Sequence, residues 1–178
     1  MIAAVVDTNV LLVANNAHDD VSPECVTTCV ERLQDLMKNG VVVIDSDWKI
    51  VGEYQQKTRP NQPKGVGDVF LKWLLKNSGN TQHVHQVDLT ETADGCFAEF
   101  PDIELQKHFD ASDRKFVAAA HSHPDKPTVW QASDCKWLDW WPQLSVAGVG
   151  IEFICPQDVS RFYAAKFPAK PIPVLPKQ

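Results

Sequence analysis

The sequence has no apolar run of the length that crosses a bilayer, and Asp7 interrupts its opening apolar segment early. That segment has neither a basic flank nor a small-residue cleavage site, the two marks of a secretory signal. Both absences argue against a membrane-spanning or secreted protein. We therefore expect a cytoplasmic protein with no membrane partner.

Basic residues are also scarce, because 17 Lys and Arg stand against 23 Asp and Glu, a formal net charge of −6. This balance argues against a protein that grips nucleic acid through overall positive potential, since neutralising phosphates requires lysine and arginine. A nuclease is compatible with it, because metal-binding carboxylates lower the net charge. Lys57, Arg59 and Lys64 could meet phosphates locally, although a solvated loop explains them as well.

The cysteines number only five, an odd count, and are scattered through predicted helices and strands. A disulfide framework is typical of small secreted chains rather than of a chain this large. We therefore expect free thiols, most of them packed in the interior. They are Cys25, Cys29, Cys96, Cys135 and Cys155.

Short β-branched runs alternate with segments of helical periodicity, which predicts a three-layer α/β/α sandwich with a mainly parallel sheet. A length of 178 residues suits one core. We expect residues 1–167 to form one domain and the proline-rich residues 168–178 to form an extended tail. The predicted strands are residues 2–6, 41–44, 83–89, 128–132 and 150–155.

Two acids follow predicted strands. Asp7 ends the strand of residues 2–6, and Asp134 follows the strand of residues 128–132 with Ser133 between them. In an open parallel sheet, sites form beyond the carboxyl ends of the strands. The alternative for each acid is an N-cap of the next helix.

Two further acids lie at the borders of apolar helix faces. Asp113 is in register with Phe116 and Val117, in a helix that Ser112 is predicted to cap. Glu53 lies next to Tyr54 in an earlier helix. The alternatives are a first-turn acid favoured by the helix dipole for Asp113 and a solvated side chain for Glu53.

If these four acids converge, they require protons or cations, because carboxylates about 4 Å apart repel by roughly 4 kcal/mol at an effective dielectric of about 20. All-oxygen ligands suit Mg²⁺ or Mn²⁺. Such an ion can activate water and offset charge on a phosphodiester. The pattern therefore predicts metal-assisted phosphodiester hydrolysis.

The segments VVDTNVLL, DWKIVGEY, DRKFVAAA, ASD and GIEFICPQDV, in this order over about residues 1–165, resemble the PIN-domain nucleases, which include toxin ribonucleases of the VapBC type. The resemblance implies a magnesium- or manganese-dependent endoribonuclease that cleaves single-stranded RNA. It also allows a toxin with a protein inhibitor (antitoxin). The implied acids are Asp7, Glu53, Asp113 and Asp134, with Thr8, Asn9 and Ser133 lining the metal shell.

The sequence departs from the family after the fourth acid, where Cys135 and Lys136 stand in place of the acidic or amide residue found in many members. Asp139 is the next acid, and Asp110 is a second candidate near Asp113. Two other functions stay open: a PIN-like binding module without turnover, and an α/β phosphomonoesterase. The aspartyl-phosphatase pattern is incomplete, because Asn9 stands where a second Asp is needed.

Histidine and tryptophan clusters offer weaker alternatives. The His83/His85 and His121/His123 pairs lack partners at zinc-finger spacing. A cluster of Trp side chains near the fourth acid favours core packing, with a base-stacking platform or a homodimer contact as alternatives. These are Trp130, Trp137, Trp140 and Trp141.

Overall fold

The computed structural model describes residues 2–18 and 20–177; residues 1, 19 and 178, within the predicted segments 1–167 and 168–178, lie outside the described residues. Five parallel strands form one sheet in the order β3-β2-β1-β4-β5. The predicted α/β fold is confirmed. The strands are β1 (Ile2–Val6), β2 (Gly40–Asp45), β3 (Val84–Val87), β4 (Thr128–Gln131) and β5 (Ile151–Phe153).

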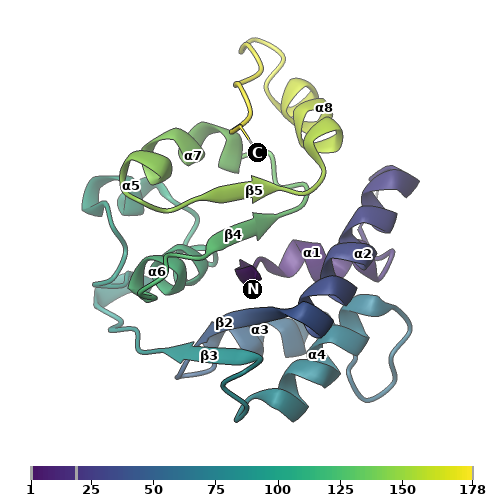
Figure 1. Ribbon diagram of the computed structural model, residues 1–178. Helices are drawn as coiled ribbons and strands as arrows, with labels where there is room; N and C mark the ends of the chain where they lie inside the picture. The colour runs from purple at the N-terminus through teal and green to yellow at the C-terminus, as the bar shows by residue number, and fades with distance from the viewer. Residues whose placement is uncertain (1, 19, 178) are drawn as a thin grey trace.

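Helices cover both faces of this sheet, so the three-layer architecture is confirmed as well. Figure 1 shows α2 and α4 on one side and α6 and α7 on the other. A 3₁₀ turn, Ala93–Gly95, lies in the segment after β3. The α-helices are α1 (Thr8–Ala14), α2 (Pro23–Asn39), α3 (Lys49–Lys57), α4 (Val66–Asn77), α5 (Ile103–His108), α6 (Arg114–Ser122), α7 (Trp137–Val146) and α8 (Pro156–Lys166).

Local chemistry explains most element boundaries. Ser22 accepts a hydrogen bond from the Cys25 N–H and Pro23 occupies the first turn of α2, as the sequence predicts. The prediction that Ser112 caps α6 is wrong. A turn closed by the Asp113 N–H and the Asp110 carbonyl places Asp113 itself at the cap of α6.

The strand order creates a crevice. Between β1 and β4 the chain first builds β2 and β3, and it then returns to the other side of β1. Right-handed crossovers therefore place the helices that follow β1 and those that precede β4 on opposite faces. The carboxyl ends of β1 and β4 thus border the switch point at which open α/β sheets form their sites.

The run of residues 55–67, rich in proline, glycine and basic residues, predicts a loop, but the loop is shorter than predicted, because α3 ends at Lys57 and α4 begins at Val66. Its end is set by close packing of α4 on α1. A Cβ atom on Gly67 would lie 2.2 Å from the Leu11 carbonyl oxygen, so only glycine allows this approach.

The tail beyond α8 has no regular helix or strand over residues 170–177, which fits an extended segment. It lies against the domain: the Trp141 Nε1–H donates to the Val174 carbonyl at 3.0 Å, and Leu175 packs on the core. In the described chain, no helix has the length and apolar character needed to span a membrane.

The prediction of five free thiols is wrong, because Cys25 in the first turn of α2 forms a disulfide with Cys155, which immediately precedes α8. The two residues are 130 positions apart in the sequence, and their Cα atoms are 5.2 Å apart, a distance that suits a disulfide. Their proximity arises because the start of α8 meets the start of α2, where Ser22 also binds Asp158, and no local sequence pattern reports this contact. Cys29, Cys96 and Cys135 are free.

Candidate metal centre

An open cavity of about 530 Å³ lies at the carboxyl edge of the sheet. Its walls come from the ends of β1 and β4 and from α1, α3, α8 and the turn before α6. It brings together all the acids and small polar residues that the sequence predicts for the site. These are Asp7, Thr8, Asn9, Glu53, Asp113, Ser133 and Asp134.

Asp7 lies at the floor of the cavity and is 5% exposed. One carboxylate oxygen accepts from the Asn9 N–H at 2.9 Å and so caps α1, while the other accepts from the Gln131 amide at 3.2 Å. Burial, and then repulsion from Asp113, raise the pKa of Asp7 well above its ordinary value, although the Asn9 hydrogen bond opposes the rise. Asp7 is therefore both a helix cap and part of the acidic cluster.

Asp110, Asp113 and Asp134 offer carboxylate oxygens that all lie within 4.8 Å of one another. Burial and the neighbouring Asp134 raise the pKa of Asp113 to about 6, although hydrogen bonds from Ser112 and Trp137 oppose this rise. Asp110 thus joins the acids that the sequence singles out. Its side chain forms an ion pair with Lys136, which the sequence does not flag as part of the site.

Glu53 lines the cavity from α3. One of its oxygens accepts from the Thr8 hydroxyl at 2.5 Å, and the other forms an ion pair with Lys115. Lys115 is 8% exposed and also donates to the Ser112 carbonyl. Glu53 is therefore a fixed, charge-compensated acid rather than a solvated one.

Gln131 is a residue of this site that sequence reasoning missed. It is the last residue of β4 and is fully buried. Its side-chain NH₂ donates to Asp7, and its side-chain oxygen accepts from the Asn9 side-chain amide and from the Asp134 backbone N–H. A polar residue at the end of a buried strand is the signal that could have found it. Its hydrogen bonds fix two strand-end acids relative to each other.

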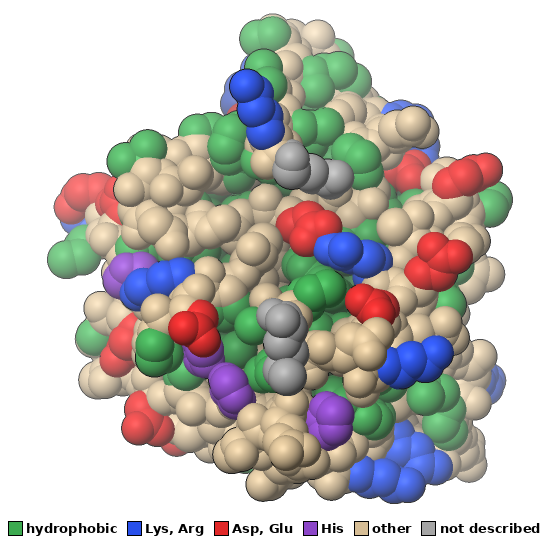
Figure 2. Space-filling model, in the orientation of Figure 1, with side chains coloured by type: hydrophobic (Ala, Val, Ile, Leu, Met, Phe, Trp, Pro, Cys, Tyr) green, Lys and Arg blue, Asp and Glu red, His purple; other side chains and the backbone are tan. Residues whose placement is uncertain are grey.

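Of the predicted basic residues, only Lys57 lines the cavity. The backbone N–H groups of Arg59 and Lys64 both bind the Asp68 carboxylate, which folds the loop onto α4. Burial would raise the pKa of Asp68, but these hydrogen bonds outweigh it and lower the pKa. On the face that Figure 2 shows, the described acidic and basic side chains are interspersed, so no extended basic surface appears there.

The cavity wall also holds residues that were not singled out from the sequence, among them His18, Phe162 and Lys166. The rings of His18 and Phe162 stack with centroids 6.0 Å apart, and the His18 ring hydrogen-bonds the Ser133 hydroxyl at 3.2 Å. An aromatic pair and two lysines, Lys57 and Lys166, thus border the acidic floor. Aromatic faces and cations are the groups that bind single-stranded nucleic acid.

The remaining candidates lie elsewhere. Asp139 accepts from the Tyr163 hydroxyl at 2.6 Å and faces Lys170 of the tail, so it is not an acid of the cavity. Within the described residues, no group of metal-capable side chains includes a histidine. His85 and His123 instead stack on each other and share a 2.9 Å contact between ring nitrogens.

The tryptophan cluster contributes mainly to the core. Trp137 is fully buried, and its ring and that of Trp140 pack against Phe109. The Nε1–H of Trp137 is the exception, because it donates to Asp113 at 3.2 Å. The packing of Trp137 therefore also supplies a hydrogen-bond donor to the acidic cluster.

The chain was compared with protein-family models, curated proteins and solved structures, and none of them matches it.

Proposed function

We propose that this protein is a PIN-like, magnesium- or manganese-dependent endoribonuclease that hydrolyses phosphodiester bonds of single-stranded RNA. The observation that carries the proposal is the convergence of Asp7, Glu53, Asp113 and Asp134 from four separate segments on one open cavity. Their order along the chain agrees with the order of acids that the family resemblance implies.

The charge balance of the cavity favours a cation. Among the described residues, the ion pairs of the cluster are Lys115 with Glu53 and Lys136 with Asp110. Asp7, Asp113 and Asp134 lie outside these pairs, and the raised pKa values of Asp7 and Asp113 reflect burial and mutual repulsion. Bringing such carboxylates together without a cation is unfavourable, whereas a bound divalent ion reverses the sign of the interaction.

The donor set fits Mg²⁺ or Mn²⁺, because the cluster of Asp110, Asp113 and Asp134 offers carboxylate oxygens, the ligands that such hard ions prefer. Asp7, Asp113 and Asp134 would hold the ion, with Glu53 lining the same cavity. When bound, such an ion polarises a phosphoryl oxygen and lowers the pKa of a coordinated water.

The protein's own residues supply orientation. Gln131 holds Asp7 and the backbone of Asp134, and Trp137 holds Asp113, so the carboxylates do not need to reorganise when a ligand arrives. Thr8 and Lys115 hold Glu53 in the same way. Glu53 is therefore placed to accept a proton from, or orient, a water molecule near the cluster.

The rim of the cavity supports a single-stranded substrate. Lys57 and Lys166 can each meet a phosphate, and the His18–Phe162 pair offers a surface on which an unpaired base can stack. A duplex would present many more phosphates to a chain of net charge −6. The choice of RNA over DNA rests on the family resemblance.

The test is a cleavage assay with nuclease-free preparations. Labelled single-stranded RNA, single-stranded DNA, duplex RNA and a phosphomonoester are incubated with Mg²⁺, Mn²⁺ or a chelator. We expect metal-dependent cleavage of single-stranded RNA that Asp7→Asn and Asp113→Asn reduce by about 10²-fold or more, whereas the exposed control Asp47→Asn retains it.

The same assay separates the alternatives. Release of phosphate from the monoester alone would favour a phosphomonoesterase, and RNA binding without cleavage under any metal condition would favour a binding module. A protein inhibitor, as in a toxin–antitoxin pair, would have to cover the cavity or its rim. Such a partner would be recognised by loss of cleavage on its addition at equimolar concentration.

A further inference from the structure

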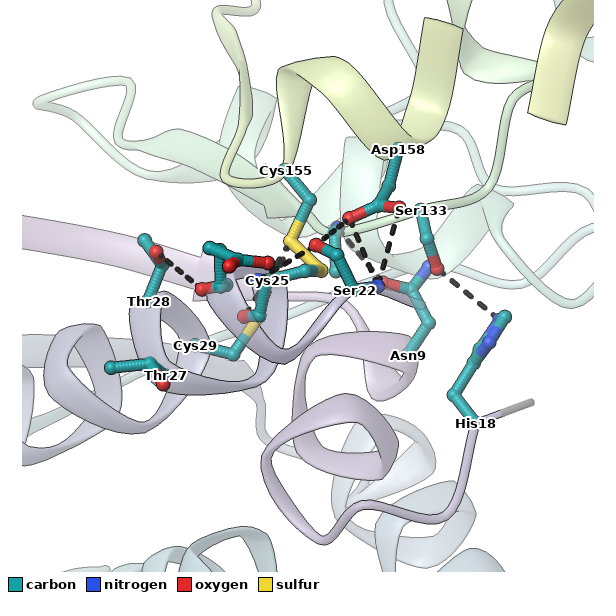
Figure 3. Close-up of a disulfide and its surroundings, with 12 residues drawn as sticks. Asn9, His18, Ser22, Cys25, Thr27, Thr28, Cys29, Ser133, Cys155 and Asp158 are labelled. Carbon is teal, nitrogen blue, oxygen red and sulfur yellow. Dashed lines mark hydrogen bonds between the residues drawn. A yellow bond between two sulfur atoms is a disulfide. The ribbon is translucent and has the colours of Figure 1, made fainter. Parts of the chain in front are cut away.

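We propose that Cys25, Cys29 and Cys155 form a thiol–disulfide exchange site that a small uncharged dithiol reduces, and that reduction loosens one wall of the acidic cavity. The effect on catalysis rests on the proposed nuclease function, while the exchange chemistry and the loosening do not. Figure 3 shows the disulfide, Cys29 and the Ser133–His18 hydrogen bond in one view.

The disulfide is one end of a series of contacts between His18 and residues 20–25 on one side and residues 155–162 on the other, which we call the loop–helix seam. The two segments run antiparallel, and each contact lies farther from the cavity than the one before. From the cavity outward, the pairs are His18 with Phe162, Asp20 with Arg161, Ser22 with Asp158, and Cys25 with Cys155.

The cavity end of the seam belongs to the candidate site, because His18, Asp20 and Phe162 all line that cavity. The middle of the seam consists of polar contacts, including the Ser22 hydroxyl, which donates to Asp158 at 2.6 Å. Asp158 is 3% exposed, and a hydrogen bond of this kind contributes on the order of 1–3 kcal/mol, less than a typical disulfide. The covalent bond between Cys25 and Cys155 is thus the strongest constraint that holds this wall against α8.

A reductant can reach the disulfide. Cys25 and Cys155 are buried, at 3% and 4% exposure, but both line a separate pocket of about 240 Å³ from which a small molecule can approach the disulfide. Glu24 and Asp158 line the same pocket, so their charges disfavour a reductant that carries carboxylates in addition to its thiols. The pocket therefore selects a small, uncharged dithiol.

The Cys155 sulfur is in a position where it can leave as a thiolate. Cys155 is the N-cap of α8, where the helix dipole stabilises a thiolate, and the Cys29 Sγ lies 3.8 Å from the Cys155 Sγ. Burial, and then the charge of Asp158, raise the pKa of Cys29 to about 12. Cys29 therefore keeps its proton and can donate it in a hydrogen bond to the departing Cys155 thiolate.

The exchange is balanced. A reductant thiolate attacks the Cys25 Sγ, a mixed disulfide forms, and Cys155 leaves as a thiolate. The second thiolate of the reductant attacks its own sulfur in the mixed disulfide and releases Cys25. The dithiol thereby loses two electrons and two protons and closes to a cyclic disulfide, Cys25 and Cys155 end as thiols, and Cys29 is unchanged.

The first measurement uses the intact protein, oxidised or reduced with dithiothreitol, the reductant then being removed anaerobically. Iodoacetamide labelling followed by peptide mapping should show Cys25 and Cys155 alkylated only after reduction. Hydrogen exchange of amides in residues 15–25 should become about tenfold faster on reduction, while those of α4 keep their rates. Unchanged exchange in residues 15–25, or alkylation of both cysteines before reduction, would overturn the proposal.

The second measurement tests the role of Cys29 with matched variants. Cys29→Ala should slow reduction by roughly three- to tenfold, because the thiolate loses a weak donor, and Cys29→Ser should restore the rate. Cys96→Ser, at a free cysteine outside the seam, should leave it unchanged. Equal rates for Cys29→Ala and Cys29→Ser, both at the wild-type value, would remove Cys29 from the exchange site.

The third measurement is RNA cleavage by both redox forms, with Cys25→Ser as a form that reductant cannot alter. Reduction should lower the wild-type cleavage rate by about tenfold, since one wall of the cavity loses its fixed position. If the seam loosens and neither form cleaves RNA, the nuclease proposal fails and the exchange site stands. If both forms cleave equally and the seam does not respond, the exchange site fails and the nuclease proposal stands.

Discussion

Replacing Asp113 with Asn should stabilise the metal-free protein at neutral pH. Burial and the neighbouring Asp134 raise the pKa of the Asp113 carboxyl from 3.8 to about 6. The folded state therefore binds this proton more tightly than the unfolded state does. The associated stability is fully present below about pH 4 and is lost as the pH rises through about 6.

The size of the effect follows from this shift. A difference of about 2 pKa units corresponds to about 3 kcal/mol of unfolding free energy at pH 7.5, as an upper figure for a partly exposed side chain. For a domain of 150–250 residues, each kcal/mol moves Tm by about 2–4 °C, so Asp113→Asn should raise Tm by up to about 6–12 °C. The substituted amide retains an oxygen that can accept from Trp137, and it cannot ionise.

The assay is a thermal melt of wild type, Asp113→Asn and the exposed control Asp47→Asn, in chelator, at pH 4 and pH 7.5. The Asp113→Asn advantage should appear at pH 7.5 and vanish at pH 4. Saturating Mn²⁺ at pH 7.5, at about 100-fold its Kd, should stabilise the wild type by about 2.7 kcal/mol and the variant much less. A variant that melts below the wild type at pH 7.5 in chelator, or an equal response of both to Mn²⁺, would refute the reasoning.

Three further outcomes test other parts of the site. Lys115→Gln leaves Glu53 without its ion pair and should lower the metal-free stability by about 1–3 kcal/mol, measured by urea unfolding, with a smaller loss in Mn²⁺; an equal loss with and without metal would assign Lys115 to packing alone. Lys57→Ala combined with Lys166→Ala should weaken RNA binding and reduce the slope of log K against log salt by about one to two units, while Arg59→Ala leaves the slope unchanged. If Arg59→Ala flattens the slope as much as the double variant, RNA follows the loop rather than the cavity rim. Gln131→Leu, which removes the amide that holds Asp7, should reduce the cleavage rate at saturating RNA more than it raises KM, and a change in KM alone would argue against a positioning role.

Most of the fold could be predicted because its signals are local. The strand Ile2–Val6, which is buried from Ala4 onward, the capping of α2 by Ser22, and the strand β3 all follow from periodicity and flanking residues. The position of Asp7 at a strand end is local in the same sense. In a parallel sheet this position leads directly to the carboxyl edge, where Asp134 also lies.

The predicted boundaries that were wrong have tertiary causes. α6 begins at Arg114 because the preceding turn places Asp113 at the cap, and α4 begins at Val66 because Gly67 packs against α1. Arg59 and Lys64 belong to the same charged run as Lys57, yet their backbone folds around Asp68 and away from the cavity. Their closeness in the sequence therefore does not predict that only Lys57 among the three lines the cavity.

The elements, their alternation and the acids at the strand ends can be inferred from the chain because periodicity and capping depend on neighbours within a few residues. Three features of the site depend on contacts between distant positions: the Lys115–Glu53 ion pair, the inclusion of Asp110, and the disulfide between Cys25 and Cys155, 130 positions apart. Their physical origin is the order β3-β2-β1-β4-β5, which sets α6 against β1 and brings the start of α8 to the start of α2. A pattern of local burial does not encode that order, so these features emerge only when the chain is folded.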